Sequence, residues 1–195
     1  MVPVDANIGR AVMTRLQKEG YRPILVGGLA IEVAGYGGTK DVGVMVPEAQ
    51  FGTTDSLAGE GLLIHSMTGG WVTNGHLTLA DGTEVPFDIL NPAKYVGTGH
   101  TGEEFYVWVE KHGSRRTRYG RVAKPSVVYY TRLLVSGPHG EAYLERIRRD
   151  LNNDAPRSWL DGSLAIARRF GTEDRVRKQI GRFEMLTQEN DLRRE

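Results

Sequence analysis

The chain has 195 residues, of which 39% are hydrophobic and 25% charged, and its formal net charge is +1. This length is enough for one sizeable core, and so small a net charge neither favours nor excludes nucleic acid as a partner. The absence of cysteine excludes disulfides, thiolate metal sites and cysteine nucleophiles. No apolar run approaches the roughly 20 residues of a membrane span, and the N-terminus lacks the pattern of a signal peptide. We therefore expect a cytoplasmic, soluble protein with no membrane partner.

The first predicted element is a helix over residues 5–19. Asp5 is a suitable N-cap, and Ile8, Val12 and Leu16 recur at the four-residue spacing of one helical face. Gly20 ends it.

Residues 22–46 form the stretch on which the functional prediction depends. An apolar run that ends at Val26 predicts a buried strand, and Gly27-Gly28 predicts a tight turn into a short helix. A glycine-rich turn follows, and the alternation of valines from Val42 to Val46 predicts a second strand with Asp41 at its head. A carboxylate at a strand end that faces a turn with free backbone N–H groups suits a metal-bound phosphate.

The middle of the chain contains the clearest hairpin. We expect a short helix within residues 48–57 and a strand over residues 62–66. Asp81-Gly82 then predicts the turn of a hairpin over residues 75–90. Asp88 lies between Phe87 and Ile89 on the second arm, so its side chain should reach the opposite face from theirs.

The second half of the chain changes character at about residue 123. Residues 105–109, FYVWV, predict a strand, and four arginines cluster around Tyr119 in residues 115–121. From Lys124 the composition favours helices, which we expect to begin at Pro125 and to cover residues 141–152, 159–170 and 173–186. The predicted division is an α/β core over residues 1–122 and a helical region over residues 123–195.

The stretch at residues 22–46 resembles the signature of the nucleotidyltransferase fold, the superfamily that includes DNA polymerase beta. That signature is a Gly-Gly or Gly-Ser pair, a short helix, and an Asp-x-Asp pair at the start of the next strand. This chain has Asp41 but carries Gly43 in place of the second aspartate. Within the superfamily the sequence motif is similar to that of the AbiEii-type toxins. The residues that carry this similarity are Gly27-Gly28-Leu29-Ala30, Thr39 and Asp41.

The resemblance implies a fold and a set of roles. The fold is α/β, a small mixed sheet followed by a helical bundle, with the site in the cleft between them. Asp41 and Asp88 would bind one or two Mg²⁺ ions and act in catalysis, with an NTP as the substrate. Gly27, Gly28, Thr39, Lys40 and Arg132 would contact the nucleotide. In the helical part, Arg149-Asp150 and Asp154 are similar to the family's Lys/Arg-Asp-x-x-Asp stretch.

Gly43 leaves several functional readings open, because the second aspartate normally binds both metal ions. The chain is an active nucleotidyltransferase in which another acid such as Glu32 or Glu48 compensates, a degenerate nucleotide- or RNA-binding protein, or a variant that was disarmed by substitution. The acceptor hydroxyl would belong to tRNA or another RNA, to a protein, or to a small molecule such as an aminoglycoside or lincosamide. The toxin resemblance adds an antitoxin-like partner.

Other patterns carry less functional information. The five histidines lie at no metal-ligand spacing, and no serine lies in a nucleophile elbow. The basic residues 115–121 are compatible with either a phosphate-backbone contact or a solvated loop.

Overall fold

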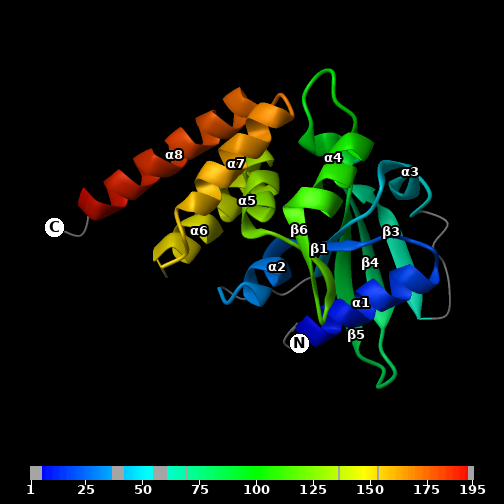
Figure 1. Ribbon diagram of the computed structural model, residues 1–195. Coiled ribbons are helices and arrows are strands. Elements are labelled where there is room, and N and C mark those ends of the chain that lie inside the picture. Colours follow the sequence, from blue (N-terminus) through cyan, green and yellow to red (C-terminus); the bar gives the residue numbers. More distant parts are fainter. Residues whose placement is uncertain are drawn as a thin grey trace.

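The computed structural model describes residues 6–36, 42–54, 61–68, 70–135, 137–152 and 154–192. Figure 1 shows a twisted sheet with the C-terminal helices gathered at one side of it. The strands are β1 (Ile24–Val26), β2 (Val42–Met45), β3 (Leu62–Thr68), β4 (Val72–Thr78), β5 (Glu84–Leu90), β6 (Ser114–Thr117) and β7 (Gly120–Ala123). The helices are α1 (Ala6–Lys18), α2 (Gly27–Val33), α3 (Glu48–Phe51), α4 (Gly102–Trp108), α5 (Pro125–Leu134), α6 (Gly137–Asn152), α7 (Ser158–Arg169) and α8 (Glu173–Leu192).

The sheet has seven strands in the order β3-β4-β5-β2-β1-β7-β6. β2 runs parallel to β5, and β1 runs parallel to β7, whereas the remaining neighbours are antiparallel. The expected α/β fold with a mixed sheet is therefore confirmed. The register sets Asn74, Asp88, Gly43 and Val26 side by side on four adjacent strands.

The predicted strand–turn–helix–strand order of residues 22–46 is confirmed for its described part. Every residue of β1 and β2 is buried, as expected for central strands that are covered on both faces. Gly27 opens α2 with φ +71°, a conformation that favours glycine, so the tight turn is made by the residue type it needs. Residues 37–41, including Thr39, Lys40 and Asp41, lie outside the described residues, as does Asp5.

The hairpin of β4 and β5 is confirmed, with Asp81-Gly82 at its turn. Gly82 has φ +82°, and the backbone N–H of Thr83 donates to the Asp81 carboxylate. Phe87 and Ile89 are buried, while Asp88 lies on the opposite face of β5. The alternation in the sequence therefore predicted the face of Asp88 correctly.

The strand predicted for residues 105–109 is wrong, because these residues lie in α4 and at the start of a π-helical turn, Val109–Gly113. Thr101 and Glu104 form a capping box that starts the helix. Phe105 and Val109 are buried one helical turn apart. So short an apolar run is compatible with both a buried strand and a helix.

Helix α5 lies at the centre of the C-terminal helices, and its residues 127–134 are all buried. It begins at Pro125 as expected and ends at Leu134, and Gly137-Pro138, expected to break the helix, lie in the first turn of the next one. However, α6 begins at Gly137, four residues before the predicted Glu141, and α8 continues to Leu192 instead of ending near residue 186. No described helix combines the length and apolar character that crossing a membrane requires.

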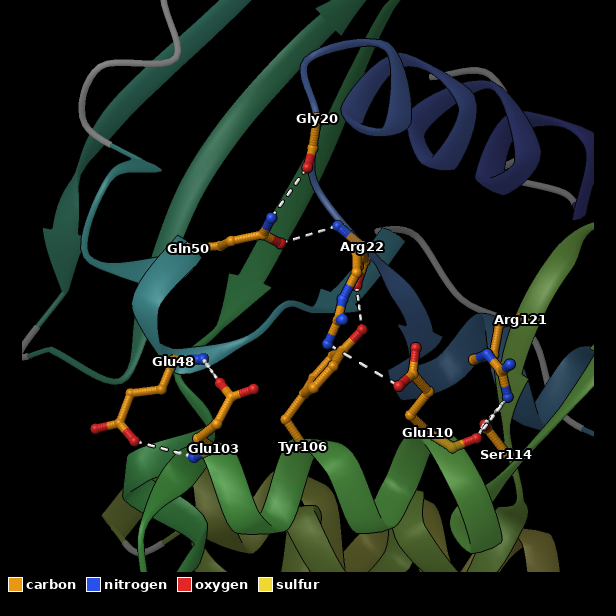
Figure 2. Close-up of polar contacts among 9 residues, drawn as sticks. All are labelled: Gly20, Arg22, Glu48, Gln50, Glu103, Tyr106, Glu110, Ser114 and Arg121. Carbon is orange, nitrogen blue, oxygen red and sulfur yellow. Dashed lines mark hydrogen bonds and ion pairs between the residues drawn. The ribbon is translucent and has the colours of Figure 1, made fainter.

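A polar network joins the start of β1 to α3, α4 and β7, as Figure 2 shows. Gln50 bridges the Gly20 carbonyl and the Arg22 backbone N–H, at 3.0 and 2.9 Å. The Tyr106 hydroxyl donates to the Arg22 carbonyl, and the Arg22 guanidinium forms an ion pair with Glu110 at 3.9 Å.

Glu48 belongs to this same region and not to the predicted site. Its carboxylate accepts the backbone N–H of Glu103, and the Glu103 carboxylate accepts the backbone N–H of Glu48 (Figure 2). Each glutamate therefore caps the first turn of the other's helix. This exchange gives Glu48 a structural role at the end of β2 opposite to the end where Asp41 precedes the strand.

Candidate functional site

A cavity of about 500 Å³ lies where the sheet meets α5 and α6. Its volume falls within the usual range for a small-molecule site. The residues that line it are Gly27, Gly28, Gly43, Trp71, Val72, Asn74, Asp88, Leu90, Tyr95, Thr131, Arg132, Val135, Tyr143 and Arg146. They divide into a polar floor, an apolar end and a cationic wall.

The floor is the row of residues that the sheet register sets side by side. The amide nitrogen of Asn74 donates to Asp88 Oδ1 at 2.6 Å, which orients the carboxylate. Gly43 is the register partner of Asp88 on β2, and Gly27 closes the row with its backbone near Gly43. The floor therefore offers one oriented carboxylate beside the backbone of two glycines.

The apolar end of the cavity is formed by Trp71, Val72, Leu90 and Tyr95. The rings of Trp71 and Tyr95 meet edge to face, with centroids 5.7 Å apart. Burial raises the pKa of Tyr95, so its hydroxyl stays neutral. Such a corner suits a flat or apolar part of a ligand.

Arg132 forms the buried part of the cationic wall. It is 6% exposed, and its Nη1 lies 3.3 Å from Asp150 Oδ2, an oxygen that also accepts the Tyr129 hydroxyl at 3.2 Å. Burial lowers the pKa of Arg132, whereas the nearby Asp150 raises it. The guanidinium nevertheless keeps one unmet donor, because Arg132 Nε has no hydrogen-bond partner among the described residues.

Arg146 and Tyr143, both on α6, complete the wall. The Tyr143 ring centroid lies 6.0 Å from the Arg132 guanidinium carbon and 5.8 Å from that of Arg146. The positive charge of the nearby Arg146 also lowers the pKa of Arg132. The wall therefore presents two guanidinium groups and one tyrosine ring to the cavity.

The structure brings together four of the predicted site residues: Gly27, Gly28, Asp88 and Arg132. The other three, Thr39, Lys40 and Asp41, lie outside the described residues. Neither Glu32 nor Glu48 is among the residues that line the cavity. The roles of all seven in catalysis and binding remain predictions.

The three residues that the resemblance singled out in the Lys/Arg-Asp-x-x-Asp stretch of the helical part differ in burial and in contacts. Asp150 is buried and supports Arg132, whereas Arg149 and Asp154 are exposed. Asp154 has φ +64°, and its carbonyl accepts the Tyr36 hydroxyl at 3.4 Å.

The arginines of residues 115–121 lie on the β6–β7 hairpin at the edge of the sheet. Arg118 stacks on the neighbouring Tyr119 ring, and Arg121 donates to the Glu110 carbonyl. None of the four arginines is among the residues that line the cavity.

Among the cavity residues that sequence reasoning missed are Asn74, Trp71, Tyr95, Tyr143 and Arg146. Asn74 directly precedes the predicted hairpin of residues 75–90, but β4 begins earlier than expected, at Val72, and so pairs Asn74 with Asp88. Arg146 follows Tyr143 by three residues on a predicted helix, so both share a face, but the sequence does not say what that face meets.

No family model and no curated protein matches the chain. Among solved structures, an antigenic nucleotidyltransferase-like protein from Paracoccidioides brasiliensis is 8% identical, with a TM-score of 0.48 over 91% of this chain and 95% of its own. JHP933 from Helicobacter pylori is 10% identical, with a TM-score of 0.36 over 95% of this chain and 94% of its own. A candidate nucleotidyltransferase from H. pylori is 14% identical, with a TM-score of 0.37 over the same shares of the two chains. All three are similarities to other proteins at low sequence identity.

Proposed function

We propose that the chain is a nucleotidyltransferase-like protein that binds an NTP in this cavity and, with Mg²⁺, transfers a nucleotide to an acceptor hydroxyl. The observation that carries the proposal is the convergence of Gly27, Gly28, Asp88 and Arg132 on one cavity. The family resemblance predicted a role for each of these residues, although they lie far apart in the sequence. A glycine turn, a carboxylate and a buried cation are the groups that phosphate chemistry requires.

The described residues fit a magnesium ion that is held partly by its substrate. Asp88 is the one acidic residue among the described residues that line the cavity, and its neighbour Asn74 would supply an amide oxygen as a further ligand. Mg²⁺ is often bound by one or two carboxylates plus substrate phosphates, so this set suffices for binding with the nucleotide. When bound, the ion would polarise the α-phosphate.

The residues of the cavity would divide the reaction between them. The acceptor oxygen forms a bond to the α-phosphorus, the bond to the bridging oxygen breaks, and pyrophosphate leaves. Asp88 would accept the proton of the acceptor hydroxyl. Backbone N–H groups of Gly27 and Gly28 would bind phosphate oxygens, and Arg132 would stabilise the charge on the leaving pyrophosphate.

Charge in the described cavity bears on the acceptor. Two arginines face one aspartate there, so a polycationic aminoglycoside is the acceptor that the described residues favour least. A hydroxyl of RNA, of a protein or of an uncharged molecule is compatible with it. An antitoxin-like partner stays a prediction from the resemblance.

A non-catalytic binding protein is the second candidate, and Gly43 favours it. In the described row, Gly43 occupies the register position beside Asp88 where a second carboxylate would stand. A cavity that keeps its cations and its glycine turn can bind a nucleotide without turning it over.

The test is calorimetric titration with each NTP, with and without Mg²⁺, together with an assay for transfer of labelled nucleotide to cellular RNA and protein. Asp88→Asn keeps an oxygen for the Asn74 hydrogen bond and removes the charge, so it should abolish the Mg²⁺-dependent part of binding. Asp81→Asn on the same hairpin is the matched control, because Asp81 lies in the exposed turn. Equal Mg²⁺-dependent binding by Asp88→Asn and the parent would contradict the role of Asp88, and binding without transfer would favour the second candidate.

A further inference from the structure

The cationic wall contains two arginines from different helices. Arg132 and Arg146 reach the same cavity from two different helices, and both guanidinium groups lie within about 6 Å of one tyrosine ring, at 6.0 and 5.8 Å. Arginine is the residue best suited to phosphate, because its planar guanidinium donates two parallel hydrogen bonds.

Arg132 is held in place from behind. Arg132 Nη1 donates to Asp150 Oδ2, and the Tyr129 hydroxyl donates to the same oxygen, so Tyr129 orients the carboxylate that contacts Arg132. A guanidinium that is 6% exposed needs partners for its N–H donors, yet Nε has none among the described residues. An anion in the cavity is the kind of group that would satisfy the donors left over.

Arg146 is a second guanidinium group at the same cavity. The guanidinium groups of Arg146 and Arg132 both lie against the Tyr143 ring, and among the described residues Arg146 forms no ion pair with a carboxylate. Two neighbouring cations are unfavourable in a partly buried site unless an anion is shared between them. Asp150 offsets one of these charges, and the only carboxylate among the described lining residues, Asp88, lies on the opposite floor.

We infer that the arginine clamp, Arg132 and Arg146 with Tyr143 between them, binds the diphosphate or triphosphate group of its ligand without a divalent metal. The inference rests on the proposed function for the placement of a nucleotide in this cavity. It goes beyond it in assigning the charge of the phosphates to the protein's own arginines, so that metal is needed for transfer and not for binding.

The experiment is titration calorimetry in excess EDTA with three probes: inorganic pyrophosphate, each NTP, and the matching nucleoside monophosphates. We expect pyrophosphate and at least one NTP to bind in EDTA with a dissociation constant within tenfold of that in Mg²⁺. Monophosphates should bind at least tenfold more weakly, because one phosphate does not reach both guanidinium groups.

The variant that tests the clamp is Arg146→Gln, since Arg146 is only half-buried and its loss should spare the fold. It should weaken binding in EDTA at least tenfold. Arg148→Gln is the matched control on the same helix, because Arg148 pairs with Glu145 at 2.6 Å outside the cavity and should bind like the parent. Arg132→Lys, checked by its melting temperature, is a second variant that keeps the charge and removes the fork.

The outcomes separate this inference from the proposed function. Binding of NTP that appears only with Mg²⁺ would overturn the arginine clamp and leave the proposed function standing. Equal binding in EDTA by Arg146→Gln and Arg148→Gln would likewise overturn the clamp. Absence of NTP binding under both conditions would overturn the proposed function itself.

Discussion

At the scale of single residues, Gly43 decides how the site is interpreted. Its φ lies outside the left-handed region, and a Cβ built there would be 3.4 Å from the Val26 carbonyl oxygen and 3.5 Å from Val26 Cγ2. These are ordinary contacts, so the backbone does not require glycine at this position. Because Gly43 and Asp88 are register partners on parallel strands, a side chain at position 43 would share the face of Asp88.

Gly43→Asp should therefore place two carboxylates together and create a tighter metal site. Without metal, like charges on paired strand positions repel, and we expect the variant to lose about 1 kcal/mol of stability. Millimolar Mg²⁺ should restore that loss, because more carboxylate ligands raise affinity for divalent ions. The measurement is the melting temperature with and without Mg²⁺.

The matched control for this substitution is Gly43→Asn, which adds a side chain of the same shape without the charge. If Mg²⁺ raises the melting temperature of both variants equally, positions 43 and 88 do not form a metal pair. A transfer assay on Gly43→Asp then separates the two functional candidates. Gain of transfer favours a disarmed enzyme, and no gain favours a binding protein.

The residues of the site differ in how far the sequence could predict them. Asp88 was predictable, because alternation fixes the face of a strand residue. In addition, a carboxylate in an apolar strand is costly to bury without a partner, which marks it as a candidate site residue. Arg132 came only from the family resemblance. Arg146 and Asn74 were missed, since a local pattern shows which residues share a face but not which faces meet across a cavity. That α6 and the sheet line one cavity follows from tertiary packing.

At the scale of elements, α4 shows where local patterns fail. The run FYVWV at residues 105–109 is rich in β-branched and aromatic residues, which favour strands. The helix forms instead, because the capping box of Thr101 and Glu104 stabilises its first turn. The contact of Glu103 with Glu48 stabilises the same turn. The β4–β5 hairpin, by contrast, was predictable because Asp81-Gly82 fixes its turn from within the element.

Thr101→Ala should destabilise the protein by about 1 kcal/mol, the usual effect of removing a hydroxyl N-cap. The Thr101 hydroxyl accepts the Glu104 backbone N–H at 3.1 Å, and Glu104 accepts the Thr101 backbone N–H at 2.9 Å. Urea unfolding measures the change. Thr101→Ser retains the hydroxyl and should stay close to the parent; if it is as unstable as Thr101→Ala, the methyl group and not the cap contributes the stability.

At the scale of the whole molecule, the C-terminal helices are fastened to the rest of the chain by buried aromatic residues. The Tyr130 hydroxyl on α5 donates to the Tyr95 carbonyl, and the Phe105 ring of α4 packs against Tyr130 and Phe170. These contacts cross the predicted boundary at residue 122. The division into two domains stays a prediction, and the aromatic contacts lead us to expect one cooperative unfolding transition.

The same buried tyrosines should set the alkaline limit of the fold. Burial raises the pKa of Tyr106 to about 12 and the pKa of Tyr130 to about 12, and it raises the pKa of Tyr95 and of Tyr129 still further. In the unfolded chain a tyrosine loses its proton near pH 10. Between about pH 10 and 12 the folded state therefore keeps protons that the unfolded state has lost.

We expect the free energy of unfolding to be unaffected by these groups below about pH 10 and to fall above it. Each tyrosine should contribute about 1.4 kcal/mol per pH unit, so the four together should unfold the protein between about pH 10 and 12. Circular dichroism and phenolate absorbance, followed together, test this. The phenolate signal of the four buried tyrosines should appear only as helical structure is lost.

Tyr106→Phe is the informative variant for this prediction. It removes one titrating hydroxyl together with its hydrogen bond to the Arg22 carbonyl. The variant should be about 1 kcal/mol less stable at neutral pH and have a shallower loss of stability above pH 10. Phenolate absorbance from all eight tyrosines of the chain while the helical signal is intact would contradict the prediction, because it would show that the buried hydroxyls ionise in the folded state.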